Sequence, residues 1–451
     1  MINISADFSI TNGRVKPMHA VNNGPAGSKV RQVSNFPAFR EAGIPYARTH
    51  DAAFYNGYGG EYTVDVHRIF RDFNADENDP ASYDFRATDA YIKDIFSVGT
   101  EPFYRLGASI EHGIKKGTYP PADFHKWARI CEHIIRHYTE GWADGFFYKI
   151  TYWEVWNEPD CQNADGSNPC FQGPLTLFAE LFDVVVKHLK SCFPRLKIGG
   201  PALCSVSKGE RLDTIFSEMK KRGTPIDFFS FHVYSATVTK IAARIDRARE
   251  WMVKYGYEDC ELILNEWNYI KGWLGEDWRL SLKREQSLFG SAFIAATMEM
   301  AQQSPLDMLM YYDARPCGMN GMFASYTFEN LKGYYPFLMF SELYREGTAV
   351  NANDDHENGV FATAAKDLKG NAAMMLTYFP EDENDTPDKE VRVSLSGIKQ
   401  NDPFKLSYYL LDEEHDATLV REEVFTASEI SAYLKMTPYS TYLLKITPCN
   451  Q

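Results

Sequence analysis

Ile150-Thr-Tyr-Trp-Glu-Val-Trp156 is a short, mostly apolar run that leads directly into Asn157-Glu158-Pro159. Other short apolar runs follow the same pattern, at residues 15–21, 45–50, 101–106, 197–200, 227–234, 261–266 and 307–312. Amphipathic stretches with helical periodicity separate these runs. Eight such alternations predict parallel strands joined by right-handed crossovers, and eight strands can close into a (β/α)8 TIM barrel. A doubly wound open sheet is the alternative, because periodicity does not show closure.

The stretch that follows Pro121 can be checked against helical geometry. At about 100° per residue, one stripe collects seven apolar side chains, which are Phe124, Trp127, Ala128, Cys131, Ile134, Ile135 and Tyr138. His133 and His137 have an i,i+4 spacing that can hold a metal, but they fall on the opposite side of the helix. We therefore expect both to be solvent-exposed, and no Glu of a zinc-protease motif lies between them.

The character of the sequence changes after about residue 350. A polar, turn-rich boundary, Asn351-Ala-Asn-Asp-Asp-His-Glu-Asn-Gly359, precedes alternating runs such as Val391-Arg-Val-Ser-Leu395 and Thr441-Tyr-Leu-Leu-Lys-Ile446. Such alternation predicts antiparallel strands with one buried face. We expect a catalytic barrel over residues 13–348 and a C-terminal antiparallel β-sandwich over residues 349–451, to which residues 1–12 can add a strand. This second unit carries no clustered chemistry, which favours a stabilising role.

Composition and charge exclude several classes of protein. The 451 residues include 47 Lys and Arg against 61 Asp and Glu, and no basic stretch offsets the net charge of −14, which argues against nucleic-acid binding. No apolar stretch reaches the ~20 residues that span a bilayer, and no secretory signal is visible. We therefore expect a cytoplasmic protein with no membrane partner. A secreted or periplasmic location is the alternative if a leader has been removed.

The eight cysteines are scattered along the chain, and no two form a Cys-x-x-Cys pair. This spacing suits reduced thiols and argues against a structural zinc site. Cys161 and Cys170 bracket a short loop, so a disulfide between them is the one exception that the spacing allows.

Two glutamates follow predicted strands at positions suited to catalysis. Glu158 comes directly after the fourth strand, and Glu266, in Leu262-Ile-Leu-Asn-Glu-Trp267, ends the seventh. Active sites of (β/α)8 barrels lie at the carboxyl ends of the strands, so the two side chains are expected to face each other across the barrel mouth. Such a pair suits glycosidic-bond cleavage, in which one carboxyl protonates the leaving oxygen and the other attacks or activates water. The alternative for either glutamate alone is a helix cap or an ion pair with an arginine.

These motifs resemble those of clan A glycoside hydrolases, which are retaining (β/α)8-barrel enzymes. The resemblance rests on Trp156-Asn-Glu-Pro159 after strand four and Asn265-Glu-Trp267 after strand seven. Within the clan, residues 15–346 look like glycoside hydrolase family 39, the family of β-xylosidases and α-L-iduronidases. The segments that carry this similarity are Arg48-Thr-His-Asp51, Asp65-Val-His-Arg-Ile-Phe-Arg-Asp-Phe73, Asp79-Pro-Ala-Ser-Tyr-Asp-Phe85 and Phe231-His-Val-Tyr234. The family's β-sandwich appendage also matches the C-terminal part.

The resemblance implies a role for each matching residue. Glu158 is the implied acid/base, and Glu266 is the implied nucleophile that forms a glycosyl-enzyme intermediate. Asn157 is expected to bind the sugar 2-hydroxyl, and Arg48 is expected to keep the nucleophile ionised. The remaining residues expected to line the sugar site are His50, His232 and Tyr234. Cleavage by such a pair needs no metal and implies no cofactor, and the retaining geometry predicts a carboxyl separation of about 5 to 5.5 Å.

Tryptophans lie near both glutamates in the sequence. Trp153 and Trp156 flank Glu158 and are candidates for the apolar surroundings that raise the pKa of an acid. Trp273 and Trp278, in the loop after the second glutamate, are candidates for a wall of the sugar site.

Three further segments are expected near the barrel mouth. At the eighth strand end, Tyr311-Tyr-Asp-Ala-Arg315 stands where clan A enzymes often have a Trp platform, and its Asp313 and Arg315 either bind substrate or pair with each other. The stretch of residues 161–173 is expected to shape the rim of the site. The glycine-rich stretch Asn56-Gly-Tyr-Gly-Gly60 is expected to be a loop at the mouth rather than a phosphate cradle.

The function that these residues favour is that of a retaining, exo-acting glycosidase on pentose-containing saccharides, similar to a β-xylosidase or an arabinosidase. An endo-acting clan A glycanase with an open cleft is the first alternative, and a non-catalytic carbohydrate-binding barrel is the second. The expected partner is a carbohydrate in every case. The sequence does not indicate the sugar, the linkage or the oligomeric state.

Overall fold

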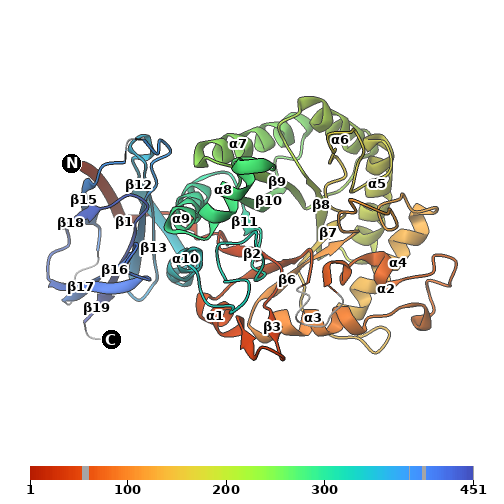
Figure 1. Cartoon of the computed structure of the whole chain (residues 1–451), viewed down its shortest axis with the longest axis horizontal. Coiled ribbons are helices and arrows are strands. Elements are labelled where there is room, and N and C mark those ends of the chain that lie inside the picture. The colour runs from red at the N-terminus through yellow and green to blue at the C-terminus, as the bar shows by residue number, and fades with distance from the viewer. Residues whose placement is uncertain (53–59, 385, 399–402, 450–451) are drawn as a thin grey trace.

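A closed barrel of eight parallel strands forms the larger part of the molecule (Figure 1), and its order is β2-β5-β6-β7-β8-β9-β10-β11. The computed structural model describes residues 1–52, 60–384, 386–398 and 403–449. The barrel strands are β2 (Ala20–Asn22), β5 (Tyr46–Thr49), β6 (Glu101–Leu106), β7 (Tyr152–Val155), β8 (Lys197–Leu203), β9 (Phe228–Ser235), β10 (Glu261–Tyr269) and β11 (Met308–Tyr311). Closure of this sheet confirms the (β/α)8 barrel and excludes the open sheet. Residues 56–59 of the glycine-rich loop expected at the mouth lie outside the described residues.

The first barrel strand begins later than the sequence predicts. The apolar run at residues 15–21 contributes only Ala20 and Val21 to β2. Val15 instead donates its N–H to the carbonyl of Gly347 at 3.0 Å, outside the barrel. Pro17 then lacks the N–H that a barrel strand needs for its ladder, so the apolar run does not become a continuous strand.

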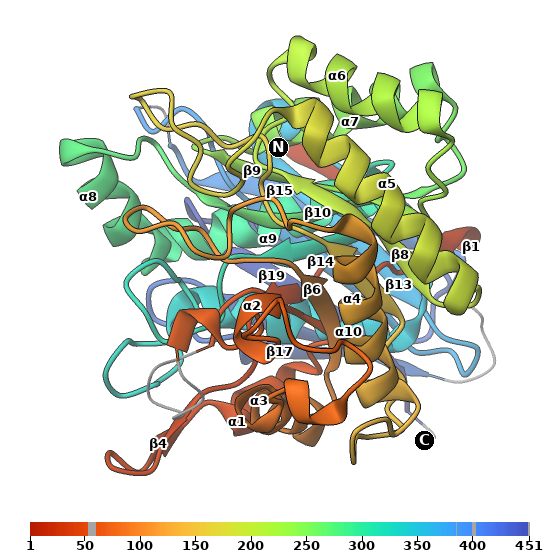
Figure 2. The ribbon, with the colours of Figure 1, turned by 90° about the vertical axis from the view of Figure 1, so that its right-hand side faces the viewer.

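Helices cover the outside of the barrel, and Figure 2, which views the molecule from its barrel side, shows α3 to α7 there. The helices are α1 (Phe36–Ala42), α2 (Val66–Ile69), α3 (Arg86–Ser97), α4 (Phe124–Thr139), α5 (Leu175–Cys192), α6 (Gly209–Arg222), α7 (Val238–Tyr255), α8 (Gly275–Glu285), α9 (Leu288–Gln303) and α10 (Tyr335–Glu346). Asp123 caps the start of α4, because its carboxylate accepts from the N–H of Lys126 at 3.0 Å. The predicted apolar stripe of α4 is buried from Trp127 onward.

The expectation that His133 and His137 are solvent-exposed is wrong. His137 is buried, its ring stacks on Phe85 with centroids 3.6 Å apart, and its Nε2 lies 2.9 Å from Asp89 of α3. His133 is half-buried, with its Nδ1 2.9 Å from the carbonyl of Arg129. The apolar stripe locates only the side of α4 that faces the barrel, whereas neighbouring elements cover a second side that periodicity does not reveal.

Strands β3 (Gly27–Ser28) and β4 (Val33–Ser34) form a small antiparallel pair between the barrel strands β2 and β5 in the sequence. The other strands form one nine-stranded sheet in the order β17-β16-β19-β14-β13-β12-β1-β15-β18. They are β1 (Ile2–Arg14), β12 (Thr348–Asn353), β13 (Val360–Lys366), β14 (Ala372–Tyr378), β15 (Lys389–Ser396), β16 (Phe404–Leu411), β17 (Thr418–Phe425), β18 (Ile430–Met436) and β19 (Thr441–Pro448). Buried residues from both ends of this order form a single core, so the sheet curls over itself. The pairing is antiparallel except between β1 and β15, which is parallel and was not expected. We propose that the barrel and this β domain meet at residues 348 and 349, at the start of β12.

Helices α9 and α10 lie between the barrel and this β domain (Figure 1). Helix α9 is apolar on almost every side, because it packs against barrel helices on one side and against β13 and β14 on the other. Among the described residues, no helix combines the length and the apolarity that crossing a membrane requires.

Candidate active site

The side chains inside the barrel change character along its axis. Towards the amino-terminal ends of the strands the interior is apolar, and it is filled by Ala20, Phe103, Tyr152, Phe228, Ile263, Met308 and Met310. Because successive inward-facing residues are two apart, the next level up contains Glu154 on β7, Ser230 on β9 and Asn265 on β10. The carboxyl ends therefore begin above a layer of buried polar groups.

A register shift in β10 brings two consecutive residues to the interior. Asn265 donates to Glu154 at 2.5 Å, and Glu266 also turns inward. The pairing of β10 with β9 is irregular between Leu264 and Glu266. Such a bulge adds one residue and re-aims the side chain that follows, and here that side chain is the second predicted catalytic carboxylate.

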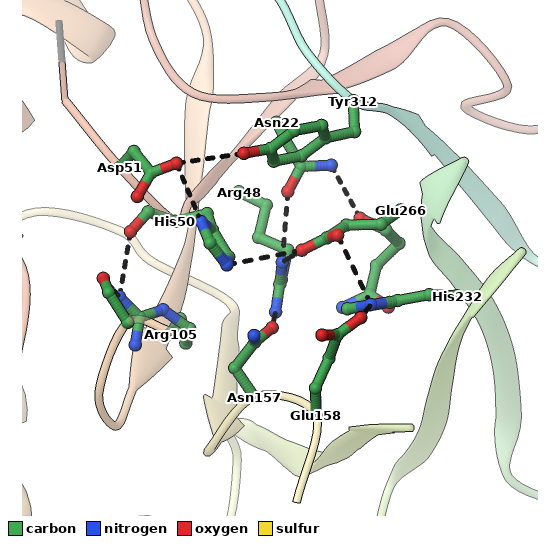
Figure 3. A network of polar contacts seen from close by, with 12 residues as sticks. Asn22, Arg48, His50, Asp51, Arg105, Asn157, Glu158, His232, Glu266 and Tyr312 are labelled. Atoms are coloured by element: carbon green, nitrogen blue, oxygen red, sulfur yellow. Dashed lines mark hydrogen bonds and ion pairs between the residues drawn. The ribbon is translucent and has the colours of Figure 1, made fainter. Parts of the chain in front are cut away.

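Arg48, on β5, occupies the centre of the polar layer and is completely buried. Its Nε donates to Glu154 at 2.6 Å. Its Nη1 donates to Glu266 at 2.6 Å and its Nη2 to the amide oxygen of Asn157 at 2.7 Å (Figure 3). One guanidinium thus balances two buried carboxylates and fixes the orientation of the Asn157 amide.

Glu266 accepts further contacts from two other strand ends. The hydroxyl of Tyr234 donates to Oε2 at 2.9 Å, and Nε2 of His50 lies 3.5 Å from Oε1. His50 is held in place by Asp51, whose carboxylate lies 3.0 Å from Nδ1. Glu266 is only 4% exposed, so these contacts replace the water that would otherwise stabilise its ionised carboxylate.

Glu158 follows β7 in a turn whose backbone lies in the left-handed region. Trp156 has a φ of 77° and Glu158 a φ of 47°, values that residues with a Cβ rarely adopt. The turn is held on both sides: the indole of Trp156 donates to the carbonyl of Cys170 at 3.0 Å, and the N–H of Glu158 donates to the carbonyl of Ala202 at 2.9 Å. This conformation directs the Glu158 carboxyl into the cavity, where Oε1 lies 2.7 Å from Nδ1 of His232.

The two glutamates have opposite electrostatic environments. Burial raises the pKa of Glu158 well above its ordinary value, and the negative charge of Glu266 adds to the shift. Burial also disfavours the ionised form of Glu266, but the positive charges beside it outweigh this effect and lower its pKa to about 2. Among the charges on His232, His50 and Arg48, that of Arg48 is permanent, whereas burial lowers the pKa of His232 to about 4.

A carboxylate oxygen of Glu158 and one of Glu266 lie within 4.8 Å of each other, with Nδ1 of His232 as their common neighbour. Both open into a cavity of about 930 Å³. Seven of the residues that the sequence singles out line this cavity, namely His50, Asn157, Glu158, His232, Tyr234, Glu266 and Trp273. Arg48 lies directly beneath them and contacts Glu266 rather than the open space.

Asp313 and Arg315 do not line this cavity. Arg315 pairs with Asp313 at 2.9 Å and with Asp51 at 3.1 Å, and Asp313 is completely buried. Of the two expectations for this pair, the structure has the mutual ion pair and gives no support for contact with substrate. Tyr312, the residue before them, lines the cavity instead and donates to Asp51 at 3.1 Å.

Residues 33–263, just over half of the chain, match glycosyl hydrolases family 39. The chain belongs to this family. Membership of family 39 confirms the resemblance found in the motifs. The match includes Glu158 but ends three residues before Glu266, so the case for Glu266 rests on the geometry of β10 and on its contacts with Arg48 and Tyr234.

Two curated relatives are bacterial β-xylosidases. The chain is 26% identical over 181 residues to that of Geobacillus stearothermophilus, covering 37% of this chain and 34% of the relative. It is 25% identical over 209 residues to that of Caldicellulosiruptor saccharolyticus, covering 43% and 37%. The chain thus spans about a third of the length of the curated relatives it matches.

Solved structures resemble the chain over its whole length. A glucosidase from Croceicoccus marinus has a TM-score of 0.81 at 20% identity, with 99% of each chain covered. A monomeric β-xylosidase from Caulobacter crescentus CB15 has a TM-score of 0.72 at 16% identity, with 100% of each chain covered. At these identities the similarity establishes the fold, including the β domain beside the barrel.

Sequence reasoning missed the carboxylate that supports the family 39 site from below. Glu154 is completely buried, and its Oε1 accepts from Ser230 at 2.6 Å and from Asn265 at 2.5 Å, while Oε2 accepts from Arg48. A signal for it was present, because Glu154 is the one charged residue within the apolar run 150–156. Glu154 is two residues after Tyr152, which points into the barrel, so its side chain points into the barrel as well.

The tryptophans next to Glu158 do not surround its carboxyl. Trp153 stacks on Tyr104, and Trp156 contacts Trp127, so both rings lie between the barrel and its helices. Trp273 does lie at the cavity, with its ring 5.0 Å from that of Tyr234. Trp278 stacks behind it at 5.6 Å.

The rim of the cavity includes the loop that follows Glu158. Cys161, Gln162, Asn163 and Ala164 line the cavity on this side. Cys161 and Cys170 are free thiols in this structure rather than the candidate disulfide.

Proposed function

We propose that this protein is a retaining glycoside hydrolase with Glu266 as its nucleophile and Glu158 as its acid/base. The observation that carries the proposal is the close carboxylate pair, whose nearest oxygens lie within 4.8 Å of each other. Inverting enzymes separate their carboxyl groups by about 6.5 to 9.5 Å to admit a water molecule, whereas retaining enzymes use about 5 to 5.5 Å. The pair in this protein is closer than the inverting range and suits the retaining geometry.

The opposite pKa shifts support this division of roles. Glu266 is ionised, so one oxygen attacks the anomeric carbon while the bond to the leaving oxygen breaks. Glu158 is protonated and gives its proton to that leaving oxygen. The ester that forms removes the negative charge of Glu266, so the pKa of Glu158 falls and its carboxylate can take a proton from water. The activated water then attacks the anomeric carbon and releases Glu266.

The orientation of Asn157 supports this reaction. Its amide oxygen accepts from Arg48 at 2.7 Å, which leaves the amide NH₂ as the donor towards the cavity. A donor at this position suits the sugar 2-hydroxyl, whose hydrogen bond strengthens in the transition state. His50 and Tyr234 are the other polar groups beside Glu266 that are positioned to contact the same ring.

We further propose exo-action on pentose-containing saccharides. The choice of pentose rests on the two curated relatives that carry the name β-xylosidase. The cavity is bounded below by the polar layer of the barrel and at the side by the loop after Glu158. Trp273, which lines the cavity and is 53% exposed, offers a flat face to a sugar ring.

A mechanism-based inhibitor tests the reaction. A panel of activated 2-fluoro glycosides, with the β-xyloside and both arabinose ring forms included, is expected to add one sugar to the chain, and peptide mapping is expected to find it on Glu266. Glu266→Gln is the matched control and should take up no label. Labelling of another carboxylate, or no labelling from any sugar of the panel, contradicts the proposal. Digestion of reducing-end-labelled xylo-oligosaccharides separates exo-action, which releases single sugars, from endo-action.

The acid/base role predicts an effect that depends on the leaving group. Glu158→Ala should lower kcat/KM for alkyl glycosides by about 10²- to 10⁴-fold, because their leaving oxygen needs a proton. Aryl glycosides with acidic phenols should be affected much less, and the alkaline limb of the pH profile should disappear. An equal loss on both classes of substrate would argue against this role.

A further inference from the structure

Three cysteine thiols gather beside the proposed acid/base. Cys161 and Cys170 belong to the loop after β7, and Cys204 follows the end of β8. The sulfurs of Cys161 and Cys170 lie within 4.8 Å of each other, and Cys204 lines the same cavity as Cys161. Sγ of Cys170 lies 3.9 Å from Oε2 of Glu158. Three potential ligands for a soft metal ion, from Glu158, Cys161 and Cys170, therefore converge at one wall of the cavity, which Cys204 also lines.

We propose that Glu158, Cys161 and Cys170 form a binding site for a thiophilic divalent cation such as Zn²⁺ or Cd²⁺, and that occupation of this site stops hydrolysis. The binding claim stands on the thiol cluster alone, whereas the inhibition claim rests on the proposed role of Glu158. The cavity opens to this site through Cys161, which is half-buried and lines the wall.

The spacing of the ligand atoms fits such an ion. One oxygen of Glu158 and the two sulfurs all lie within 4.8 Å of one another. In a tetrahedral zinc site the metal–sulfur distance is about 2.3 Å and the metal–oxygen distance about 2.0 to 2.2 Å, so neighbouring ligand atoms are roughly 3.6 to 3.8 Å apart. The measured 3.9 Å between Cys170 and Glu158 is close to this value. Rotation of the Cys161 side chain supplies the remaining adjustment.

The backbone around the thiols is already fixed. The N–H of Cys170 donates to Asn168 at 2.8 Å, and its carbonyl accepts the Trp156 indole. The N–H of Cys204 donates to Asp160 at 2.8 Å, and its Sγ lies 3.4 Å from the same carboxylate. Cys204 lines the same cavity, so its thiol is a candidate for a further sulfur ligand. Thiolates are the ligands that zinc and cadmium prefer, and they release their protons on binding.

Coordination of Glu158 has a direct chemical consequence. A carboxylate oxygen bound to a cation cannot carry the proton that the leaving oxygen requires. The ion would also place positive charge at the position where the aglycone of a substrate leaves. Inhibition is therefore expected to be strongest for substrates with poor leaving groups.

A second group of ligand-type side chains provides a matched comparison. Glu132, His188 and Cys192 also lie within 4.8 Å of one another, on α4 and α5 at the outside of the barrel. This group contains one thiol, whereas the cavity group contains two with a third beside it. Cys192→Ser thus removes a thiol from a similar cluster without touching the cavity.

Titration of the whole, reduced protein with Cd²⁺ in the presence of a phosphine reductant tests the site. We expect the ultraviolet absorbance of cadmium–thiolate bonds to saturate at one ion per chain. The Cys161→Ser/Cys170→Ser double variant should lose this absorbance, while Cys192→Ser should keep it. Loss of the signal in Cys192→Ser, or its persistence in the double variant, overturns the proposal.

Inhibition is measured in the same variants as a fraction of each variant's own uninhibited rate. The Cd²⁺ concentration that halves hydrolysis of a glycoside should rise at least tenfold in the double variant, and a chelator should restore the wild-type rate. Inhibition that appears only with hydrogen peroxide and is reversed by the reductant would assign the cluster to disulfide formation instead. If the absorbance appears but the protein hydrolyses no glycoside, the metal site stands and the proposed function fails.

Discussion

The two ends of the barrel are built by the same strands from opposite kinds of side chain. Phe228 and Ile263 belong to the apolar layer at the amino-terminal ends of β9 and β10. Further along the same two strands, His232 and Glu266 face the cavity. Residues at one end stabilise the barrel by burying apolar surface, whereas those at the other end are buried charges that cost stability unless they are paired.

A single layer of polar residues lies between these two ends, and it supplies the charge that pairs with the buried carboxylate at the carboxyl end. Arg48 contacts carboxylates on both sides of it, Glu154 within the layer and Glu266 above it. All three are less than 5% exposed. The comparison predicts that substitutions in the polar layer strongly affect both stability and activity, whereas those at either end affect chiefly one of the two.

The largest effect is expected from Arg48→Met. This change leaves two buried carboxylates without their counter-charge, so the free energy of unfolding should fall by about 3–5 kcal/mol. Urea unfolding followed by circular dichroism measures it. The matched control is Arg279→Met, because Arg279 is exposed on α8 and pairs with Glu276 on the surface. The control should leave the unfolding midpoint unchanged. An unchanged midpoint for Arg48→Met would mean that Arg48 in the polar layer does not stabilise the two buried carboxylates.

A smaller loss of stability without loss of activity is expected from Ile263→Ala. The residue is completely buried in the apolar layer, and removal of three carbons there should cost about 3 kcal/mol through lost burial and a residual cavity. Well below the unfolding temperature, kcat/KM on an aryl glycoside should stay within about twofold of the wild type. A drop of tenfold or more would show that the apolar end also sets the geometry of the site.

Much of the fold was predictable because each barrel strand is a local apolar run. The predicted runs of β6 and β9 differ from the observed strands by at most one residue at each end. Glu158 and Glu266 were identified because the first follows such a run and the second ends one. The prediction for β2 was wrong about where the strand begins. The apolar run starts before Pro17, but proline has no N–H to donate to a strand ladder, and the strand begins only at Ala20.

The contacts between strands were not predictable, because they depend on register and closure. The sequence does not show that Arg48 meets Glu154 across the barrel, since the two lie 106 positions apart. It also does not show that Arg315 pairs with Asp51 as well as Asp313, or that a bulge turns both Asn265 and Glu266 inward. These features arise from the closed sheet rather than from any one segment.

The smallest expected effect is at the carboxyl end of the barrel. Tyr234→Phe removes the hydroxyl that donates to Glu266 at 2.9 Å and favours its ionised form. The pKa of Glu266, about 2 in the wild type, should therefore rise by about one unit, since a hydrogen bond to a charged group contributes about 1.5 kcal/mol. Glu266 must be ionised to attack, so the acidic limb of kcat/KM moves to higher pH and the variant loses more activity at low pH than at neutral pH.

Trp273→Phe is the matched control for this shift, because Trp273 packs against the Tyr234 ring without contacting Glu266 through a hydrogen bond. It should change KM and leave the acidic limb in place. The free energy of unfolding adds an independent sign test. A carboxyl whose pKa is lowered on folding stabilises the protein above its unfolded pKa and loses that contribution as pH falls through the folded value. Tyr234→Phe should therefore be destabilising at neutral pH, with a difference that shrinks in acid. An acidic limb that does not move would mean that the neighbouring positive charges, and not the Tyr234 hydroxyl, set the ionisation of Glu266.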